Sequence, residues 1–546
     1  MCKLPTGTSK PGCLSKSYKD LASTEDYDVD ELAQTETETG EHGLKKDAIG
    51  FSDGLTIALA STAPAYSLAA VIGSIVVIVG FQAPAALLVS FVPMFFIAAA
   101  FYYLNRADQD CGTSFSWVTR AIGPQSGWIV GWAICVTGIL VVGSLADVAA
   151  YSFFDLIGAE GLEESIAAVT LLALGLIALM TTICVLGTEL SANLQKGLMV
   201  LQIGPLLVFA GVALYKVLAG DAPAAAVDPS LSWFNPFAIE SGGALTGALL
   251  LGVFIYWGWE SAVNLNEETE GSVTAPGLAG LISTVLLLVT YLGVATALVA
   301  WKGAAGAERF DDNEAILSGY ATGVLGDPLG NIVLLAVVVS ALASTQTTIL
   351  PAARTSLSMA RAEAMPAALG EVSSRFFTPV ISTVTIGVLA VAWYLPSKLI
   401  SENFLFDSLS ALALMIAFYY AFTGIACAVY YRRELTKSVK NFLFVGVAPV
   451  IGAVLLGYLF FKALVDYADP ANSYTGASWF GVAPPAVIGV GFLALGVVLL
   501  VAWRRHQREP FFLRRREVAP PGLLEKAPSQ TPPPAGRPPA FAEGEP

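Results

Sequence analysis

The sequence predicts an all-α integral membrane protein with about twelve transmembrane helices, and three observations support this fold class. The 546 residues are 55% hydrophobic and only 13% charged, with a mean hydropathy of +0.67, whereas about a quarter of the residues in a soluble domain are charged. Apolar runs of about twenty residues, the length that crosses a bilayer as a helix, recur along the chain. Lysine and arginine gather in alternate connections between these runs. The lipid bilayer is therefore the expected surroundings of most of the chain.

Taken in order, the apolar runs predict one span each. The spans are expected near 51–80, 84–104, 125–153, 165–187, 195–219, 244–266, 277–301, 329–353, 379–396, 405–431, 442–465 and 481–503. With the N-terminus inside, the inner connections carry about three times as many lysines and arginines as the outer ones. Because positive residues are retained in the cytoplasm, both termini are expected there. The protein is expected to be a multi-pass protein of the plasma membrane.

Polar tails are expected on both sides of the membrane domain, which we place at residues 48–505. Residues 1–47 are acidic and carry much of the net charge of −14, and such a stretch cannot bury enough apolar area to fold. Residues 506–546 are first basic and then Pro-rich, which predicts a second disordered tail. The arginines after the last span, such as Arg504 and Arg514, are interpreted as a positive-inside anchor or as a binding surface for anionic lipid heads.

The sixth span is the most informative segment, because the sequence Trp257-Gly258-Trp259-Glu260 interrupts it. An ionised carboxylate in hydrocarbon costs roughly 2.5–3.5 kcal/mol, so it persists where water, a partner or a substrate meets it. A glycine between two tryptophans also favours a helix break, and broken helices at membrane depth are tolerated where they line a cavity or are buried in protein. Glu260 is interpreted as a brace for the broken helix, as a proton-linked gate, or as both.

The first span carries a comparable interruption at Ser61–Ser67, where Pro64 lacks an N–H and should open the helix just before it. Alone, Pro64 would indicate a simple kink. Paired with the break at Gly258, it predicts a transporter's binding site, since such sites form between discontinuous helices at corresponding positions. A restarting helix offers N–H groups to a carboxylate, and an ending helix offers carbonyls to an ammonium group. The pair therefore predicts a site for zwitterions such as amino acids.

The predicted spans lack the groups that most metal- and thiol-dependent enzymes require. The two histidines, His42 and His506, lie in the tails, and the six cysteines form no Cys-x-x-Cys pair. Neither a zinc site nor a disulfide framework is therefore indicated. We do not expect an enzyme, a cofactor or a nucleic-acid partner. The expected partners are a small-molecule substrate, the bilayer and a coupling ion, H⁺ or Na⁺, and the sequence indicates no particular oligomeric state.

Four motifs, found in the correct order along the twelve predicted spans, resemble those of a known family. They are Phe254–Glu260 followed by Asn264–Glu268, Gly112–Trp117 continuing to Trp132, Arg354–Pro366, and Arg375–Pro379. Together they resemble the amino acid–polyamine–organocation permeases between about Ala48 and Arg505. The resemblance implies five-plus-five inverted repeats, at about 48–219 and 244–431, with two additional helices at about 442–503.

The resemblance also implies roles for residues at the two breaks. Phe254 takes the position of an aromatic gate over the substrate, Gly258 is the flexible break, and Glu260 matches a glutamate linked to gating and protonation. We expect the substrate carboxylate at the backbone of residues 63–66 and its amine at the carbonyls of 254–256. The expected substrate-binding residues are Ser61, Thr62, Ala63, Ala65, Tyr66, Phe254, Ile255, Tyr256, Trp257 and Gly258.

Two departures from the family pattern affect the expected coupling. Many members carry a Gly-Ser-Gly group at the first break, where this chain has Thr62-Ala63-Pro64-Ala65, so Pro64 removes one donor from the carboxylate cradle. Some proton-coupled relatives carry a lysine in the fifth span at the position of Gln202, and a glutamine has no proton to give. Glu260 therefore becomes a leading candidate for carrying the proton.

Three further residues are candidates for gating or coupling. Ser344 and Thr345 of the eighth span offer hydroxyl oxygens to Na⁺, or they bond to carbonyls of their own helix and permit close packing. Asp147, an acid within the third span, is interpreted as an attractor for a cationic group, as a proton carrier, or as part of a water-filled outer vestibule.

Together these observations predict a secondary active transporter for amino acids or related amines. It is expected to work by alternating access and to be coupled to H⁺ or to exchange. Polyamines and other organic cations are the main alternative substrates, and Asp147 favours them. Outside transport, the alternative is a nutrient sensor that uses a transporter scaffold and signals through its tails.

Overall fold

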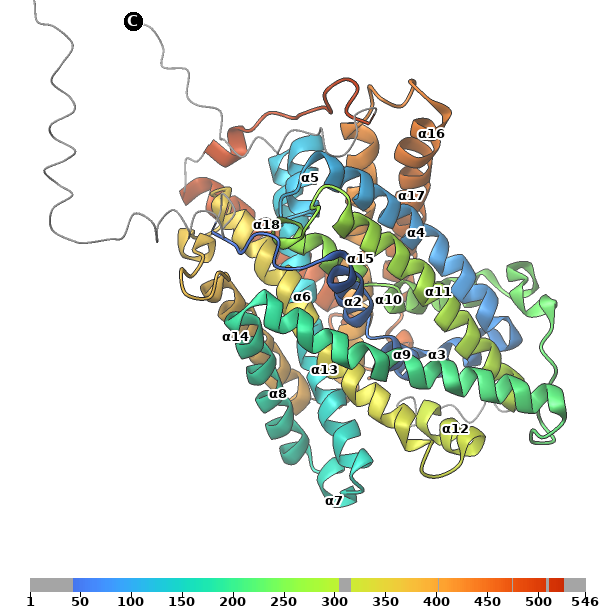
Figure 1. Cartoon of the computed structure of the whole chain (residues 1–546). Helices are drawn as coiled ribbons and strands as arrows, with labels where there is room; N and C mark the ends of the chain where they lie inside the picture. The colour runs from blue at the N-terminus through green and yellow to red at the C-terminus, as the bar shows by residue number, and fades with distance from the viewer. Residues whose placement is uncertain (1–42, 304–315, 401, 474, 507–509, 525–546) are drawn as a thin grey trace, which may run out of the picture.

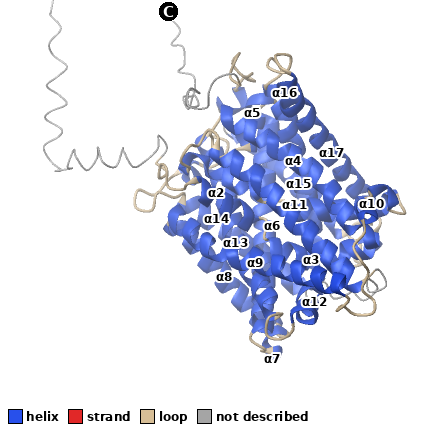
Figure 2. Cartoon of the chain, turned by 45° about the vertical axis from the view of Figure 1, so that its right-hand side comes forward, coloured by secondary structure: helices blue, strands red, loops and turns tan. Residues whose placement is uncertain are grey.

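The computed structural model describes residues 43–303, 316–400, 402–473, 475–506 and 510–524, and it folds into a bundle of helices (Figures 1 and 2). The β-structure among these residues consists of two isolated bridges, Ile49 with Thr269 and Trp479 with Val482. The predicted all-α fold class is therefore confirmed.

The long helices follow the predicted order of the spans. They are α2 (Phe51–Ser61), α3 (Pro64–Val79), α4 (Ala83–Ala107), α6 (Pro124–Leu156), α8 (Ile166–Leu186), α9 (Thr188–Ala219), α10 (Gly242–Ile255), α11 (Ala275–Lys302), α13 (Asn331–Arg361), α14 (Val380–Ile400), α15 (Glu402–Tyr430), α17 (Ala448–Asp466) and α18 (Pro484–His506). Shorter helices connect them. These are η1 (Gly80–Gln82), α5 (Ser114–Ala121), α7 (Glu160–Glu163), η2 (Leu231–Phe234), η3 (Pro236–Ala238), η4 (Trp259–Glu268), α12 (Ile316–Leu325), η6 (Ala367–Gly370), α16 (Val439–Asn441), η7 (Phe442–Val447), η8 (Pro470–Asn472) and η9 (Pro510–Leu513).

Eleven segments of the described chain are long and apolar enough to cross a membrane. The first, Phe51–Ala107, has 57 residues, which would extend about 85 Å as one straight helix and so far exceeds the ~30 Å of hydrocarbon. The chain changes direction within it at Gly80, which has a φ of 57°. This segment therefore holds the first two predicted spans, and all twelve are accounted for.

The second group of five spans repeats the first group with inverted orientation. A broken helix opens each group, and a short helix follows the second span of each, α5 in one and α12 in the other. Figure 1 shows α5 and α12 at opposite ends of the bundle. Both short helices pack alike, because a Cβ at Gly127 would overlap Thr119 and a Cβ at Gly330 would overlap Thr322. This matched packing is what the inverted repeats implied by the resemblance would produce.

Helices α6 and α13 form the centre of the bundle. In each of them, 83% of an apolar stretch of 18 residues is buried inside the bundle, compared with 28% of such a stretch in α9 and 22% in α18. A Cβ at Gly138 of α6 would lie 2.8 Å from the Cβ of Ala352 on α13, so the two central helices approach closely. Outer helices instead expose large apolar side chains, such as Leu171, Val200 and Val498. Lipid tails are the expected cover for this apolar surface, because soluble proteins rarely expose so much of it.

The described chain ends, residues 43–50 and 510–524, lie at the same end of the bundle, which we call the terminal face. Leu44 packs with Cys111 and Leu357, and Phe511 packs nearby with Phe115 and Met359. The other end, called the opposite face, carries α7 and α12, as Figures 1 and 2 show. The membrane-length helices run between these two faces.

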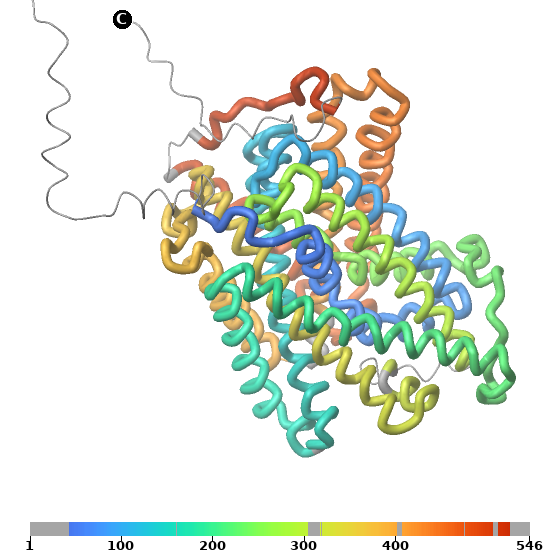
Figure 3. Tube along the Cα trace, in the orientation of Figure 1, coloured from blue at the N-terminus to red at the C-terminus, as the bar shows by residue number. Residues whose placement is uncertain are grey.

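Part of the predicted C-terminal tail packs onto the terminal face, which differs from the expectation of disorder after residue 505. Figure 3 shows residues 510–524 crossing this face as a red tube. Phe511 is 0% exposed and Ala519 is 1% exposed. Composition alone misses such a segment, because a few apolar residues within an arginine- and proline-rich stretch hold it in place. Residues 1–42 and 525–546 of the two predicted tails lie outside the described residues.

Candidate substrate site

The first span breaks where the sequence predicts, because α2 ends at Ser61 and α3 begins at Pro64. Ala63 between them has φ 47° and ψ 60°, a left-handed conformation that costs a non-glycine residue about 1–3 kcal/mol. Pro64 occupies the first position of α3, where a missing N–H leaves no helical bond unmade. The break is therefore a full helix restart, with the positive dipole end of α3 inside the protein.

The sixth span also breaks at the predicted place. Helix α10 ends at Ile255, and the 3-10 helix η4 runs from Trp259 to Glu268. Gly258 joins them with φ 115° and ψ −20°, a conformation that favours glycine. The prediction that Gly258 is the point of interruption is confirmed.

The two breaks face each other at van der Waals distance. A Cβ added to Gly258 would lie 2.6 Å from the carbonyl oxygen of Ser61 and 3.1 Å from the amide nitrogen of Thr62. The hydroxyl groups of Ser61 and Ser261 lie 2.6 Å apart and share a hydrogen bond. Two physical constraints therefore favour glycine at position 258. The first is its positive φ, and the second is the neighbouring backbone of Ser61 and Thr62, which leaves no room for a Cβ.

Glu260 lies beneath the second break and is held by tyrosines from α15. The hydroxyl of Tyr419 donates to Oε1 of Glu260, and the hydroxyl of Tyr420 donates to Oε2 over 2.5 Å. The amide of Gly258 also donates to Oε2, at 3.1 Å. Tyr419 in turn accepts a hydrogen bond of 2.5 Å from the indole N–H of Trp257. The carboxylate, only 7% exposed, thus ties the broken helix to α15.

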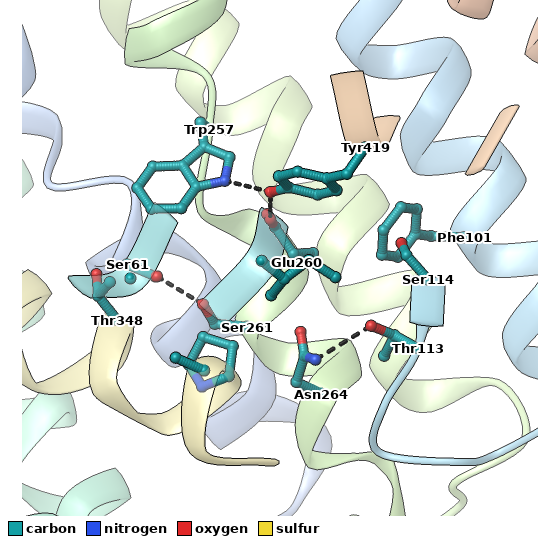
Figure 4. A pocket seen from close by; sticks show the side chains of 14 residues that line it. Ser61, Phe101, Thr113, Ser114, Trp257, Glu260, Ser261, Asn264, Thr348 and Tyr419 are labelled. Carbon is teal, nitrogen blue, oxygen red and sulfur yellow. Dashed lines mark hydrogen bonds between the residues drawn. The ribbon is translucent and has the colours of Figure 1, made fainter. Parts of the chain in front are cut away.

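A small cavity lies at this carboxylate, with a volume of about 20 Å³. Figure 4 shows the carboxylate of Glu260 pointing toward the hydroxyl of Tyr419, with Phe101, Ser61 and Asn264 among the side chains around the cavity. Its lining residues are Ser61, Phe101, Thr113, Ser114, Ile134, Gly138, Trp257, Glu260, Ser261, Asn264, Thr348, Pro351, Ala352 and Tyr419. This volume admits one or two water molecules. The structure is therefore closed around its site, and an amino acid would need a wider conformation.

The predicted substrate residues gather around the breaks, but few of them line this cavity. Ser61 and Trp257 do so, whereas Thr62, Ala63, Ala65, Ile255 and Gly258 form the packed backbone of the two breaks. Tyr66 reaches the hydroxyl of Ser144 at 3.4 Å.

Phe254 faces a second, apolar cavity on the side of the breaks away from Glu260. This cavity has a volume of about 30 Å³ and includes Val71, Leu250 and Leu409 in its lining. The phenyl ring of Phe254 is 7% exposed. The two cavities thus lie on either side of the breaks, and Phe254 borders only the apolar one.

One of the carbonyls expected to receive the substrate amine is occupied in this conformation. The hydroxyl of Tyr291 on α11 donates to the carbonyl oxygen of Ile255 at 2.8 Å. The neighbouring Tyr256 is fully buried, its ring packs against Tyr291 at 5.2 Å, and its hydroxyl has no hydrogen-bond partner. A substrate amine would have to displace the hydroxyl of Tyr291 to reach the carbonyl of Ile255.

The two hydroxyl candidates of the eighth span differ in their partners. Ser344 donates to the carbonyl of Ser61 at 2.9 Å and so bonds to the first break. Thr345 donates to the carbonyl of Ala341 in its own helix at 2.8 Å. Such a bond corresponds to the packing alternative of the sequence analysis and not to ion binding. Thr348, one turn beyond Ser344, lines the cavity and its hydroxyl has no partner. Of these groups, Ser344 and Thr348 are the ones directed at the site.

Gln202 and Asp147 lie outside the lining of this cavity. The side chain of Gln202 on α9 is 1% exposed, and neither its oxygen nor its nitrogen has a hydrogen-bond partner within the described part of the chain. Asp147 on α6 forms an ion pair of 3.1 Å with Lys398 of α14 and accepts a hydrogen bond of 2.5 Å from Tyr394. Asp147 therefore already has a cationic partner in this conformation.

Charged residues close the terminal face below the cavity. Glu268 and Arg354 form an ion pair of 3.1 Å, and both side chains are 0% exposed. Thr188 accepts from Arg354 at 3.0 Å and donates to Glu268 at 2.5 Å. The amide of Ile49 donates to the carbonyl of Glu268 at 3.1 Å. These contacts fasten η4 to α9, α13 and the N-terminal segment.

Among the described residues, Asp110, Cys111 and Glu267 form a group whose ligand atoms lie within 4.8 Å of one another. Protein donors already engage the two carboxylates. Ser358 donates to Asp110 at 2.6 Å, and Arg361 forms an ion pair of 3.0 Å with Glu267. We interpret this group as the anchor of residues 108–113 on α13.

Sequence reasoning did not identify Tyr419, Tyr420, Lys398 or the Glu268–Arg354 pair as parts of these networks. A signal existed for the tyrosines, because two adjacent hydroxyl-bearing residues occupy the middle of an apolar span. Buried tyrosine hydroxyls need partners, and Glu260 was the natural acceptor.

Comparison with known proteins is consistent with this arrangement. The family model described as "Amino acid permease" matches residues 56–501. The chain is 22% identical over 417 residues to the low-affinity putrescine importer PlaP of Escherichia coli strain K12, and the match covers 75% of this chain and 85% of the relative. The PlaP sequence of Escherichia coli O157:H7 matches equally well. The family model covers most of the chain, including both broken helices. The chain therefore belongs to the amino acid permease family.

Proposed function

We propose that this permease is a secondary active transporter that moves amino acids or closely related amines by alternating access. The observation that carries the proposal is the pair of facing helix breaks, in which Gly258 lies against the backbone of Ser61 and Thr62. Helix breaks at membrane depth are otherwise costly, because backbone polar groups must be satisfied without water. The presence of two helix breaks in this chain is explained if the backbone groups that they leave without helical partners bind a polar substrate.

The chemistry of the site suits a substrate with an ammonium group. Glu260 supplies the negative charge, and Phe101, Trp257 and Tyr419 supply aromatic walls to the same cavity. A cation gains from both, since aromatic faces attract cations by about 0.5–2 kcal/mol. A substrate carboxylate, where present, would be received by the N-terminal turn of α3.

Following the positive-inside rule, the proposal places the terminal face in the cytoplasm. It places the protein in the plasma membrane, as the sequence analysis expects. In the closed conformation, Glu268–Arg354 and the bond from Ile49 block exit on the terminal side. Release to the cytoplasm would require η4 and α15 to separate from α6 and α13. Glu260 ties η4 to α15 within this moving part, and its protonation or its contact with substrate would weaken the bonds to Tyr419 and Tyr420.

Amines without a carboxylate are the second candidate substrates. Pro64 removes one N–H from the turn that would bind a carboxylate, and the relatives named above are importers of putrescine. A diamine would use Glu260 and leave the first turn of α3 without an anionic partner.

Uptake into proteoliposomes that contain the full chain tests the proposal. Each amino acid should be offered beside the amine that its decarboxylation gives, with H⁺ gradients, Na⁺ gradients and internal counter-substrate applied separately. Glu260→Gln should slow or uncouple transport, while Glu240→Gln, the same change at an exposed acid, should not. Absence of accumulation under every condition would refute the transporter proposal.

A further inference from the structure

The C-terminal segment 510–524, here called the strap, crosses the terminal face in contact with two groups of helices. Its first contact is with helices on one side of the cavity. Phe511 is 0% exposed and packs with Phe115 of α5, Trp128 of α6 and Met359 of α13. The rings of Phe511 and Phe115 are stacked at 5.8 Å. Arg514 donates to the carbonyl of Ala362 at 3.4 Å.

The second contact is with the end of α15 on the other side of the cavity. The amide of Ala519 donates to the carbonyl of Tyr430 at 2.9 Å, and the amide of Gly522 donates to Oε1 of Glu434 at 2.9 Å. Between these contacts, the amide of Glu517 donates to the carbonyl of Arg120 at 2.7 Å. Figures 1 and 3 show the strap passing from the region of α18 over α5 toward α16.

The two anchoring points belong to helices that line opposite walls of the cavity. Ile134 and Gly138 of α6 and Thr348 of α13 line one wall, and Tyr419 of α15 lines the other. Tyr430 lies about 16 Å along α15 from Tyr419 at 1.5 Å per residue. The strap is therefore bonded to the same helix whose tyrosine holds Glu260.

We propose that the strap is a built-in brake that stabilises the conformation closed to the terminal face. In the proposed transport cycle, opening on this side separates α15 from α6 and α13, and the strap bridges these elements. It can remain bound only while they stay together. Release of Phe511 from its pocket is then coupled to opening of the cavity. The strap thereby adjusts the rate of transport, and this role rests on the proposed function.

A matched pair of substitutions isolates the strap from general effects of the tail. Phe511→Ser removes the buried anchor, whereas Leu513→Ser alters a side chain that is 78% exposed two residues away. A chain that ends at residue 524 retains the whole strap, and a chain that ends at residue 509 lacks it. These four variants keep every residue of the substrate site.

Native Cys135 on α6 is chosen as a reporter of opening that does not require transport, because the adjacent Ile134 lines the cavity. It is 3% exposed, and its thiol donates to the carbonyl of Ala352, a residue of the cavity lining, at 3.7 Å. Purified proteins in lipid nanodiscs are treated with N-ethylmaleimide, and labelling of the peptide with Cys135 is followed by mass spectrometry. Initial exchange rates in proteoliposomes are measured in parallel with the best substrate of the full chain.

We expect Phe511→Ser and the chain ending at 509 to label at Cys135 at least about tenfold faster, which corresponds to about 1.4 kcal/mol. Their exchange rates should rise, while Leu513→Ser and the chain ending at 524 should match the full chain. Unchanged labelling of Cys135 in both Phe511→Ser and the chain ending at residue 509 would overturn the brake, whether or not their melting temperatures fall. If no variant transports anything but labelling changes as expected, the strap does stabilise the closed conformation, and the proposed transport function fails together with the strap's effect on transport rate.

Discussion

Replacing Gly258 by alanine should disrupt the contact between the two helix breaks. The added Cβ would lie 2.6 Å from the carbonyl oxygen and 2.8 Å from the carbonyl carbon of Ser61. Ordinary contacts begin near 3.4 Å, so the two backbones would have to separate by about 0.8 Å. These atoms are backbone and cannot rotate away as a flexible side chain would.

The expected cost combines two terms. Overpacking of a filled interior costs about 1–3 kcal/mol, and a non-glycine residue at a φ of 115° costs about another 1–3 kcal/mol. The sum, about 2–6 kcal/mol, is a large fraction of the 5–15 kcal/mol that typically separates folded from unfolded proteins. We therefore expect Gly258→Ala to lower both the melting temperature and the initial uptake rate.

Gly247→Ala is the matched control, because it lies on α10 and its Cβ would meet only Ile78, at 3.7 Å. Alanine there is also the better helix former by about 1 kcal/mol. Melting can be followed by tryptophan fluorescence of the purified proteins, and uptake in proteoliposomes. If Gly258→Ala behaved like Gly247→Ala in both assays, the facing arrangement of the breaks would be refuted.

Three further substitutions test the networks around the site. Glu260→Gln should remove the pH dependence of uptake while the protein still inserts, and an unchanged pH profile would make Glu260 a structural brace. Tyr420→Phe should lower uptake by about tenfold to a hundredfold, because a hydrogen bond to a charged group contributes about 1.5–3 kcal/mol; a rate within twofold of wild type would contradict its role. Arg354→Ala should destabilise the protein by about 3–5 kcal/mol, since it leaves the buried Glu268 without its cationic partner, whereas Lys45→Ala, at an exposed pair, should change stability by less than about 1 kcal/mol. Equal melting temperatures of these last two variants would contradict the assigned importance of the buried pair.

The two breaks could be predicted because single residues encode them. Pro64 cannot donate to the preceding turn and Gly258 readily takes a positive φ, so each marks its position without knowledge of the tertiary structure. Spans follow from apolar length in the same way. Their number and the fold class were therefore accessible from the sequence.

The partners of the charged residues were not accessible, because they are set by which helix faces meet. Tyr419 lies 159 residues from Glu260 along the chain, and no local pattern pairs them. Asp147 was interpreted as open to a cation or to water, but α14 continues to Ile400 and brings Lys398 against it. The strap escaped prediction for a related reason, since the pocket for Phe511 combines residues of α5, α6 and α13.

The position of bound substrate is the most direct test of the site. A cryo-electron microscopy structure of the full chain with its best-transported substrate should show the ammonium group within about 3.2 Å of an oxygen of Glu260. The rest of the substrate should lie between the breaks at Ser61–Tyr66 and Phe254–Gly258. A substrate bound only in the apolar cavity near Leu250 and Leu409, with Glu260 still held by both tyrosines, would contradict the proposed site.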